Sequence, residues 1–240
     1  MKLKMKYYTN RAWQKLFPKF DFTIPFRKNS LAYVSNPPGS VYKFAANSDG
    51  FEDLKVIIKI LTEGDIFFDI GANFGMYTLS VHDKFDRTVS IHCFEPEHDA
   101  FRRLAQARNI NKANWEINKF ALGEHNGWTR ITNTLGGYNH IIQDGSEGDL
   151  IPVMTLDEYL LQSKIQKVKV VKIDVEGFEL FVLKGAKAAL KNRVFENIIF
   201  EVDDHQKRYS VEADDYKKLL ESFGYHIKKE SSNFQLWSIS

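Results

Sequence analysis

Cysteine is nearly absent from this sequence of 240 residues, which contains only Cys93. A single cysteine cannot form an intramolecular disulfide or a cysteine-based zinc cluster, and its rarity is typical of proteins in a reducing compartment. Because Cys93 lies within a predicted buried strand, we interpret it as a small core residue. Long apolar runs are also missing, since the best candidate, residues 56–61, is short and contains Lys59. A membrane span needs roughly 18 apolar residues.

The beginning of the chain lacks the apolar stretch of a secretory signal, because no run of about 7 to 15 apolar residues follows Lys2, Lys4 and Lys6. We therefore expect a cytoplasmic protein without a transmembrane segment. Net charge is only +2, yet residues 1–30 contain eight Lys or Arg against one Asp. This local excess fits contact with an anionic partner. The favoured alternative is a segment that packs on the rest of the protein through Trp13, Leu16, Phe17 and Phe20, which follow helical spacing.

Regular periodicity begins only after about residue 50. Residues 1–50 contain Pro18, Pro25 and an Asn-Pro-Pro-Gly turn at 36–39, which favour irregular structure. We expect a basic, aromatic leader or lid in residues 1–50 and a folded domain in residues 51–240.

Strand and helix patterns alternate through that domain. Continuous apolar strands separated by amphipathic helices predict a parallel sheet covered on both faces. The stretch 123–149 is rich in glycine and is predicted to be irregular. The fold class is therefore α/β, with a doubly wound, mostly parallel sheet and an antiparallel hairpin at its C-terminal end. Helices are predicted at 51–62, 75–83, 97–108, 155–163, 178–190 and 212–223, and strands at 66–70, 89–94, 115–120, 167–173, 197–202, 225–230 and 233–239.

A glycine turn joins the strand 66–70 to the next helix. We expect Gly71 to let the backbone approach a ligand, Gly75 to allow close helix packing, and the helix N-terminus to offer N–H groups. A dinucleotide fold prefers G-x-G-x-x-G, whereas this turn reads G-x-x-x-G with Asp69 at the strand tip. A carboxylate there repels a pyrophosphate. It suits the cationic methionine end of S-adenosylmethionine (AdoMet).

A second acid ends the next strand in the segment Phe94-Glu95-Pro96, 26 residues after Asp69. In this topology the tip of the second strand lies beside the ribose of a nucleotide ligand. Glu95 can accept hydrogen bonds from both ribose hydroxyls, and its charge excludes a 2′-phosphate.

These motifs resemble those of the FkbM family of methyltransferases. The resemblance implies a class I (Rossmann-like) methyltransferase fold, AdoMet as cofactor, and O-methylation of a sugar hydroxyl on a glycan or nucleotide-linked sugar. The sequence departs from the family where Glu97-His98-Asp99 follows Pro96, which makes the start of the helix unusual. The similar segments are residues 69–78, 94–96 with Phe101 and Leu104, 121–123, 153–160 and 170–186. The implied cofactor-binding residues are Asp69, Gly71, Asn73, Gly75, Tyr77, Thr78 and Glu95, with Phe120 and Ala121 near the adenine.

Acids also follow the strand 167–173, at the sheet edge where such folds bind ligands. We take Asp174 and Glu176 there as catalytic candidates, because methyl transfer to a hydroxyl needs positioning and a group that removes the proton. His205 is the first candidate for this base and His140 the second, while a solvated loop histidine is the alternative for both. Glu179 fits a structural role at a helix start.

Two further expectations concern the acceptor side. Asp174, Asp203 and Asp204 allow a divalent cation, Mg²⁺ or Mn²⁺, because hard cations prefer oxygen ligands. Trp128, Tyr138 and Phe178 lie in segments that fit an acceptor pocket, although core packing explains such residues as well.

Other functions are compatible with parts of the sequence. A nucleic-acid methyltransferase would use the basic segment, but Ile173-Asp174-Val175-Glu176 lacks the Asn/Asp-Pro-Pro-aromatic motif of base amino-group methylation, so we expect no DNA partner. A methyltransferase acting on another small molecule, a catalytically inactive AdoMet-fold binding subunit and a nucleotide-sugar oxidoreductase are the remaining alternatives. A homodimer is compatible with the sequence.

Overall fold

The computed structural model describes residues 22–26, 30–34, 51–133, 135, 138–201 and 204–239. The segment with Trp13, Leu16, Phe17 and Phe20, predicted to pack on the rest of the protein, lies outside these residues, and so does Asp203.

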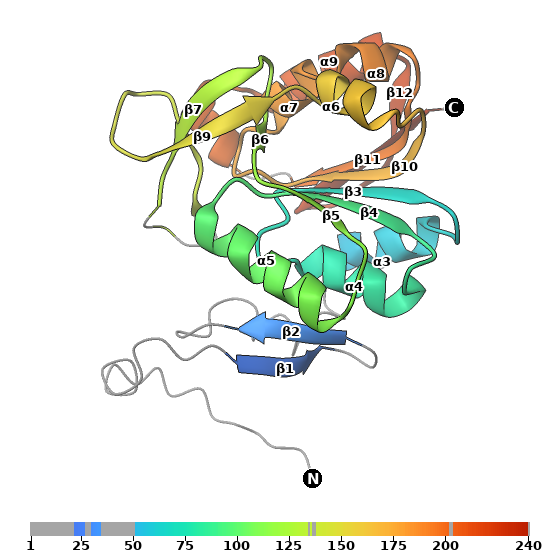
Figure 1. The fold of residues 1–240 in the computed structure, drawn as a ribbon. Coiled ribbons are helices and arrows are strands. Elements are labelled where there is room, and N and C mark those ends of the chain that lie inside the picture. The colour runs from blue at the N-terminus through green and yellow to red at the C-terminus, as the bar shows by residue number, and fades with distance from the viewer. Residues whose placement is uncertain are drawn as a thin grey trace.

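A seven-stranded sheet forms the centre of the molecule, in the order β12-β13-β11-β10-β3-β4-β5 (Figure 1). Neighbouring strands from β11 to β5 run parallel, whereas β13 is antiparallel to both β11 and β12. The predicted doubly wound sheet with its antiparallel C-terminal hairpin is thus confirmed. Its strands are β3 (Ile66–Ile70), β4 (Ser90–Phe94), β5 (Glu116–Asn118), β10 (Val168–Ile173), β11 (Phe195–Glu201), β12 (Tyr225–Glu230) and β13 (Phe234–Ile239).

Helices cover both faces of this sheet (Figure 1). One face packs against α3 (Glu52–Ile60), α4 (Met76–Phe85) and α5 (His98–Ile110). The other packs against α6 (Leu156–Ser163), α7 (Glu179–Lys184), α8 (Lys187–Lys191) and α9 (Ala213–Ser222). Successive side chains of β3 point to opposite faces of the sheet. Phe67 belongs to the apolar cluster with α3, α4 and α5, and Phe68 to the cluster with α6, α7, α8 and α9. Cys93 is fully buried, as its interpretation as a core residue requires.

The predicted helix 178–190 is wrong in one respect, because it is divided into α7 and α8 at Gly185. A Cβ on Gly185 would lie 2.0 Å from the carbonyl oxygen of Gly123. The chain therefore turns where it packs against the backbone of Gly123, and glycine is also a weak helix former.

A second sheet corrects the prediction of irregular structure at 123–149. Strands β6 (Ala121–Leu122), β7 (Gly127–Ile131), β8 (Ile141–Ile142) and β9 (Asp149–Met154) form it in the order β6-β9-β7-β8. Its strands are short and their outer residues are exposed, so the apolar periodicity is weak. Ile131, Ile141 and Ile151 nevertheless lie in the core cluster, and they hold this small sheet over the carboxyl end of the central one.

The N-terminal half of the chain contains an antiparallel hairpin that the sequence did not reveal. Strands β1 (Phe22–Phe26) and β2 (Ser30–Val34) pair with each other, and β2 packs against α4 and α5. Phe26 and Ala32 are buried in the same cluster as these helices. Asn111, at the end of α5, accepts from the Leu31 N–H and donates to the Leu31 carbonyl, both at 2.7 Å. The division into a lid of residues 1–50 and a domain of residues 51–240 stays a prediction.

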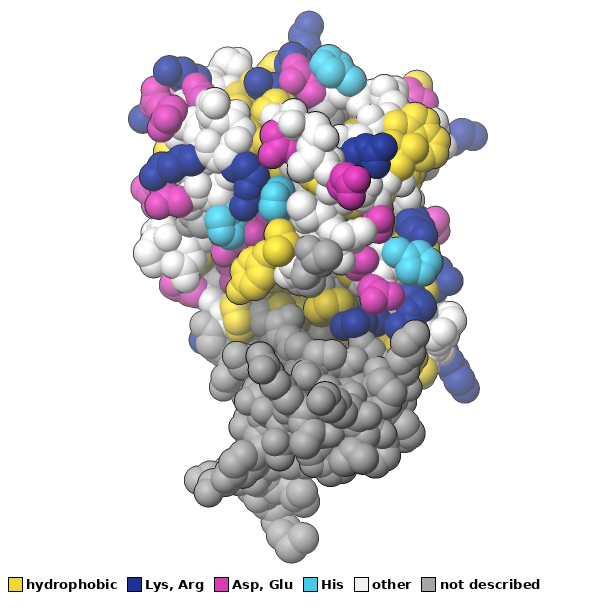
Figure 2. Space-filling model, turned by 90° about the vertical axis from the view of Figure 1, so that its left-hand side faces the viewer, with side chains coloured by type: hydrophobic (Ala, Val, Ile, Leu, Met, Phe, Trp, Pro, Cys, Tyr) yellow, Lys and Arg dark blue, Asp and Glu magenta, His cyan; other side chains and the backbone are white. Residues whose placement is uncertain are grey.

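The surface carries charges of both signs. Figure 2 shows Lys and Arg side chains interspersed with Asp and Glu over the described part of one face, without a broad area of either sign. Among the helices that the structure describes, none is long and apolar enough to cross a membrane.

Candidate active site

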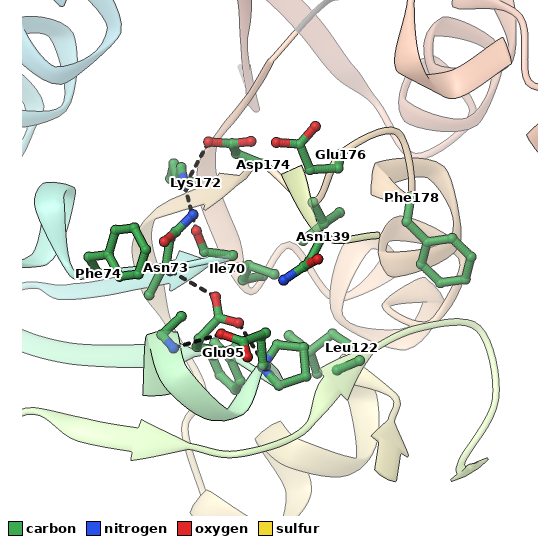
Figure 3. A pocket seen from close by; sticks show the side chains of 18 of the residues that line it. Ile70, Asn73, Phe74, Glu95, Leu122, Asn139, Lys172, Asp174, Glu176 and Phe178 are labelled. Atoms are coloured by element: carbon green, nitrogen blue, oxygen red, sulfur yellow. Dashed lines mark hydrogen bonds and ion pairs between the residues drawn. The ribbon is translucent and has the colours of Figure 1, made fainter. Parts of the chain in front are cut away.

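A cavity opens where β3 and β10 lie side by side and their connections leave in opposite directions. This is the switch point of a doubly wound sheet, where the carboxyl ends of the strands leave a crevice. Including its open mouth, the cavity encloses about 1130 Å³. Its walls come from the ends of β3, β4 and β10, from Phe26 of the hairpin and from the small sheet. Figure 3 shows its polar side chains converging from these elements.

The glycine turn after β3 forms one wall. Gly71 has φ +73°, and a Cβ there would lie 1.8 Å from the carbonyl oxygen of Asp174. The close contact with the β10 end therefore requires glycine at this position, and the approach of its backbone to a ligand stays a prediction. Asn73 also has a positive φ of 50°. Such conformations in residues other than glycine cluster at functional sites.

Asp69 lies beneath the cavity and is fully buried. Its Oδ2 accepts from the Thr78 backbone N–H at 3.1 Å and from the Thr78 hydroxyl at 2.6 Å. These bonds anchor the first turn of α4 to β3. Asp69 and Thr78 therefore support the cavity from below, whereas Gly75 packs closely against Leu104 of α5; none of the three is part of the described lining.

Glu95 stands at the tip of β4 with its carboxylate fixed in place (Figure 3). One oxygen accepts from the Asn73 N–H and the other from the Glu97 N–H, each at 2.8 Å. Burial raises the pKa of Glu95 to about 7, although these two N–H groups oppose the shift. A carboxylate has about four acceptor positions, so both oxygens keep one for a ligand hydroxyl.

The unusual segment after Pro96 has a structural explanation. Glu97 is the N-cap of α5, and its carboxylate accepts from the N–H groups of Asp99 and Ala100. An acidic N-cap satisfies the first free N–H groups of a helix. The departure from the family pattern therefore starts the helix normally and leaves Glu95 directed at the cavity.

Aromatic and apolar residues line much of the remaining cavity wall. Phe120 and Ala121 border the cavity beyond Glu95, as the resemblance implied for an adenine. Tyr77 lines the opposite end, where its hydroxyl donates to the carboxylate of Asp53. Burial and the charge of Asp53 raise the pKa of Tyr77 far above its usual value, so this phenol stays neutral.

Lys172 is a lining residue that the sequence interpretation missed. It is 3% exposed and lies in register with Asp69 on the neighbouring strand. Its Nζ donates to the Gly71 carbonyl at 3.1 Å and lies 3.2 Å from Asp174 Oδ2 and 3.4 Å from Asp69 Oδ1. A lysine near the end of the otherwise apolar run 170–173 was the available signal, because lysine is almost never fully buried unless it is paired.

Asp174 and Glu176 both line the cavity, directly after β10 (Figure 3). Glu176 has φ +57°, and its Oε2 lies 2.8 Å from Nδ1 of His205. His205 begins the short 3₁₀ helix η3 (His205–Tyr209) and is not among the described lining residues. Gly177 makes this contact feasible, because a Cβ there would lie 2.5 Å from the His205 carbonyl.

The small sheet brings a second histidine to the cavity. His140 lines it together with Asn139, a residue that we had not singled out. Nδ1 of His140 lies 3.2 Å from the Tyr138 carbonyl, which favours a tautomer with the proton on Nδ1. Of the aromatic candidates, Phe178 lines the cavity and stacks on Phe181, whereas Trp128 and Tyr138 are exposed and lie outside its lining.

The carboxylates do not assemble into a metal site in the described part of the chain. No group of three or more His, Cys, Asp or Glu side chains there is arranged to bind a metal ion. Asp174 pairs with Lys172, and the exposed Asp204 pairs with Lys207 at 2.7 Å. The proposed Mg²⁺ or Mn²⁺ has no support from these residues, and Asp203 lies outside them.

The cavity thus brings most of the predicted site residues together. Those that line it are Gly71, Asn73, Tyr77, Glu95, Phe120, Ala121, His140, Asp174, Glu176 and Phe178. The predicted residues outside its described lining are Asp69, Gly75 and Thr78 near the glycine turn, His205, which contacts Glu176, and the exposed Trp128, Tyr138 and Asp204.

Comparison with known protein families gives a match to the methyltransferase FkbM domain over residues 69–227. This match extends from Asp69 at the glycine turn to β12. It includes every predicted site residue, since these lie between Asp69 and His205.

Individual relatives are more distant. The hexuronic acid methyltransferase AglP of Haloferax volcanii is 28% identical over 170 residues, covering 70% of this chain and 66% of AglP. The 31-O-demethyl-FK506 methyltransferase FkbM of Streptomyces tacrolimicus is 27% identical over 177 residues, covering 60% of this chain and 67% of that protein. A solved structure of methyltransferase FkbM from Methylobacillus flagellatus KT has a TM-score of 0.54 and 17% identity, over 73% of this chain and 43% of that one. It shows that the fold is shared.

Proposed function

The chain belongs to the FkbM family of methyltransferases, and we propose that it transfers a methyl group from AdoMet to a sugar hydroxyl. The observation that supports AdoMet as the methyl donor is the fixed carboxylate of Glu95, which the Asn73 and Glu97 N–H groups hold at the tip of β4. A carboxylate in this place matches the two hydroxyls of a ribose.

The described residues fit AdoMet along the length of the cavity. Phe120 and Ala121 offer an apolar surface for adenine, and Glu95 offers acceptors for the ribose. At the other end, Asp174 gives negative charge beside the glycine turn, where the cationic methionine end would lie. When bound, AdoMet supplies an electrophilic methyl group.

The acceptor sugar would bind in the part of the cavity between Glu176 and the small sheet. Removing the hydroxyl proton as the oxygen attacks requires a base within hydrogen-bonding reach. We assign this role to His205, because the contact between Nδ1 and Glu176 orients the ring and leaves Nε2 as the basic nitrogen, as in other carboxylate–histidine pairs. His140, which lines the cavity from the opposite wall, would then position the acceptor.

The sugar acceptor rests on the relatives. One of them is named for a hexuronic acid, which supports a sugar acceptor, and the other for a 31-O-demethyl compound, which supports methyl transfer to an oxygen. The chain spans about two thirds of the length of these relatives, so their acceptors guide the choice of substrates to test.

The test is methyl transfer from labelled AdoMet to a panel of neutral sugars, uronic acids and nucleotide-linked sugars, with mass spectrometry of the products. We expect a methylated sugar. His205→Asn should lower the rate of a single turnover by about a hundredfold or more without weakening AdoMet binding, whereas His140→Asn should mainly raise the KM for the acceptor. His226→Asn, on the exposed edge strand β12, is the matched control and should change neither.

Binding without turnover on any acceptor would favour a binding subunit, and methylation of nucleic acid would replace the sugar in this proposal. Tight binding of NAD without AdoMet binding would overturn the methyltransferase function itself.

A further inference from the structure

Lys172 has no assigned part in binding or catalysis, although it is the single Lys or Arg among the described residues that line the cavity. It lies on β10, 3% exposed, between the two acids Asp69 and Asp174. The ring of Tyr77 covers its ammonium group at 4.6 Å. Burying an ammonium is costly unless it is paired and hydrogen-bonded, so its position calls for an explanation.

Oxygen atoms of three neighbouring residues surround its ammonium group. An ammonium group has three N–H bonds, and three oxygens lie within 3.4 Å of Nζ: the Gly71 carbonyl, Asp174 Oδ2 and Asp69 Oδ1. The contact with the Gly71 carbonyl is a hydrogen bond, and the contacts with Asp174 and Asp69 are ion pairs. Lys172 therefore acts on the cavity through its neighbours, by tying the β10 end to the glycine turn and holding one oxygen of Asp174.

The charges of this cluster do not cancel. Two carboxylates and one ammonium leave a net charge of −1 at the methionine end of the cavity. Burial lowers the pKa of Lys172, but Asp174 and Asp69 outweigh this and raise it, so the ammonium persists. Glu201 on β11 also faces Lys172, and Asp53 on α3 accepts from Tyr77; both add negative charge. Tyr77 itself is neutral.

We propose that Lys172 is a positioning residue that fixes Asp174 at the cavity wall and limits the local charge, which sets how strongly the site prefers the donor over its demethylated product. This rests on the proposed function. AdoMet carries a sulfonium cation, whereas the product S-adenosylhomocysteine (AdoHcy) has a neutral thioether and is otherwise the same molecule. A net negative cluster attracts the donor, and that attraction disappears once the methyl group has left.

The measurement is the ratio of the Kd for AdoHcy to the Kd for AdoMet, by titration calorimetry of the whole chain at about pH 8. Contacts to adenosine and to the amino-acid group are common to both ligands and cancel in the ratio. Asp174→Asn removes one negative charge and should lower the ratio, whereas Lys172→Gln removes the positive charge and should raise it. At several ångströms and an effective dielectric constant near 20, each shift should be about three- to thirtyfold.

Opposite shifts of the ratio in the two variants distinguish an effect of charge from a structural one. Loosening the glycine turn would weaken the binding of both ligands equally and leave the ratio unchanged. Lys169→Gln is the matched control: Lys169 lies on the same strand, pairs with Glu196 at 2.6 Å outside the cavity, and should leave the ratio unchanged.

Equal ratios in wild type and Lys172→Gln, or shifts in the same direction for both cavity variants, would overturn the proposal while leaving the methyltransferase function intact. If Lys172→Gln does not fold, the test depends on Asp174→Asn alone, and a ratio equal to that of wild type would overturn the proposal. If neither ligand binds wild type, the proposed function fails first.

Discussion

At the scale of single residues, Glu95 should make donor binding depend on pH. Burial raises its pKa to about 7, and ribose hydroxyls donate best to the ionised carboxylate. AdoMet affinity should therefore fall as the pH drops below 7, approaching tenfold per pH unit. Calorimetry from about pH 5.5 to about pH 8.5 tests this. Glu95→Gln should flatten the profile and Glu116→Gln, exposed on neighbouring β5, should not. A flat wild-type profile would contradict the assignment.

Glu179 is a second buried acid, with a structural role. Its carboxylate accepts from the Val175 and Gly177 N–H groups and from the Tyr216 hydroxyl. Burial raises its pKa from 4.5 to about 7. Between these values the folded state binds more protons than the unfolded chain, so this contribution to stability is present below about pH 4.5 and is lost as the pH rises through 7.

Glu179→Gln should therefore stabilise the protein at about pH 8 by about 2–3 kcal/mol and change little at about pH 5. Glutamine keeps an oxygen for the two N–H groups and offers an amide donor to Tyr216 Oη. Urea unfolding measures the difference. Glu196→Gln is the contrast, because Lys167 and Lys169 hold the pKa of Glu196 below its usual value, and it should destabilise at pH 8. Equal stability of Glu179→Gln and wild type at pH 8 would refute the prediction.

At the scale of elements, the turn between β10 and α7 is fitted against η3. Gly177 has φ +98°, and an added Cβ would meet the backbone of His205 at 2.5 Å. Gly177→Ala should displace η3, and with it His205. We expect a loss of about 1–3 kcal/mol of stability and a fall in the single-turnover rate, with AdoMet affinity nearly unchanged.

Gly145→Ala is the control for this substitution. Gly145 also has a positive φ, +79°, but an added Cβ would meet nothing within 4 Å. Gly145→Ala introduces the same backbone strain as Gly177→Ala but no steric clash, so it should lower the stability and leave the single-turnover rate unchanged. Equal losses of turnover in both variants would show that η3 is not the affected element.

At the scale of the whole molecule, the cavity joins parts that are distant in the sequence. Phe26 comes from the N-terminal hairpin, Ile131 and Ile141 from the small sheet, and Glu95 from the central one. AdoMet at a hundred times its Kd should add about 2.7 kcal/mol to the stability and raise Tm by about 5–10 °C. Calorimetric scanning should show one transition that moves as a unit and a much smaller shift in Glu95→Ala. Two transitions, with only one moving, would mean that the parts unfold separately.

The sequence by itself determined the order of the central elements and the two strand tips that line the cavity. Strand 66–70 and the C-terminal pair were predicted within a residue, because apolar runs bounded by turn residues are local signals. The same holds for Gly71 and Glu95: they stand at the ends of consecutive strands, and parallel strands bring their carboxyl ends to one edge whatever the rest of the chain does.

Only the tertiary structure decided what those residues contact. The register of β3 with β10 places Lys172 beside Asp69, so that Asp69 supports the cavity from below and Lys172 occupies its wall. The strands of the small sheet and of the N-terminal hairpin have weak periodicity, and packing on the larger body stabilises them. Pairing between distant segments depends on which surfaces are buried together, and no local pattern of residues records that.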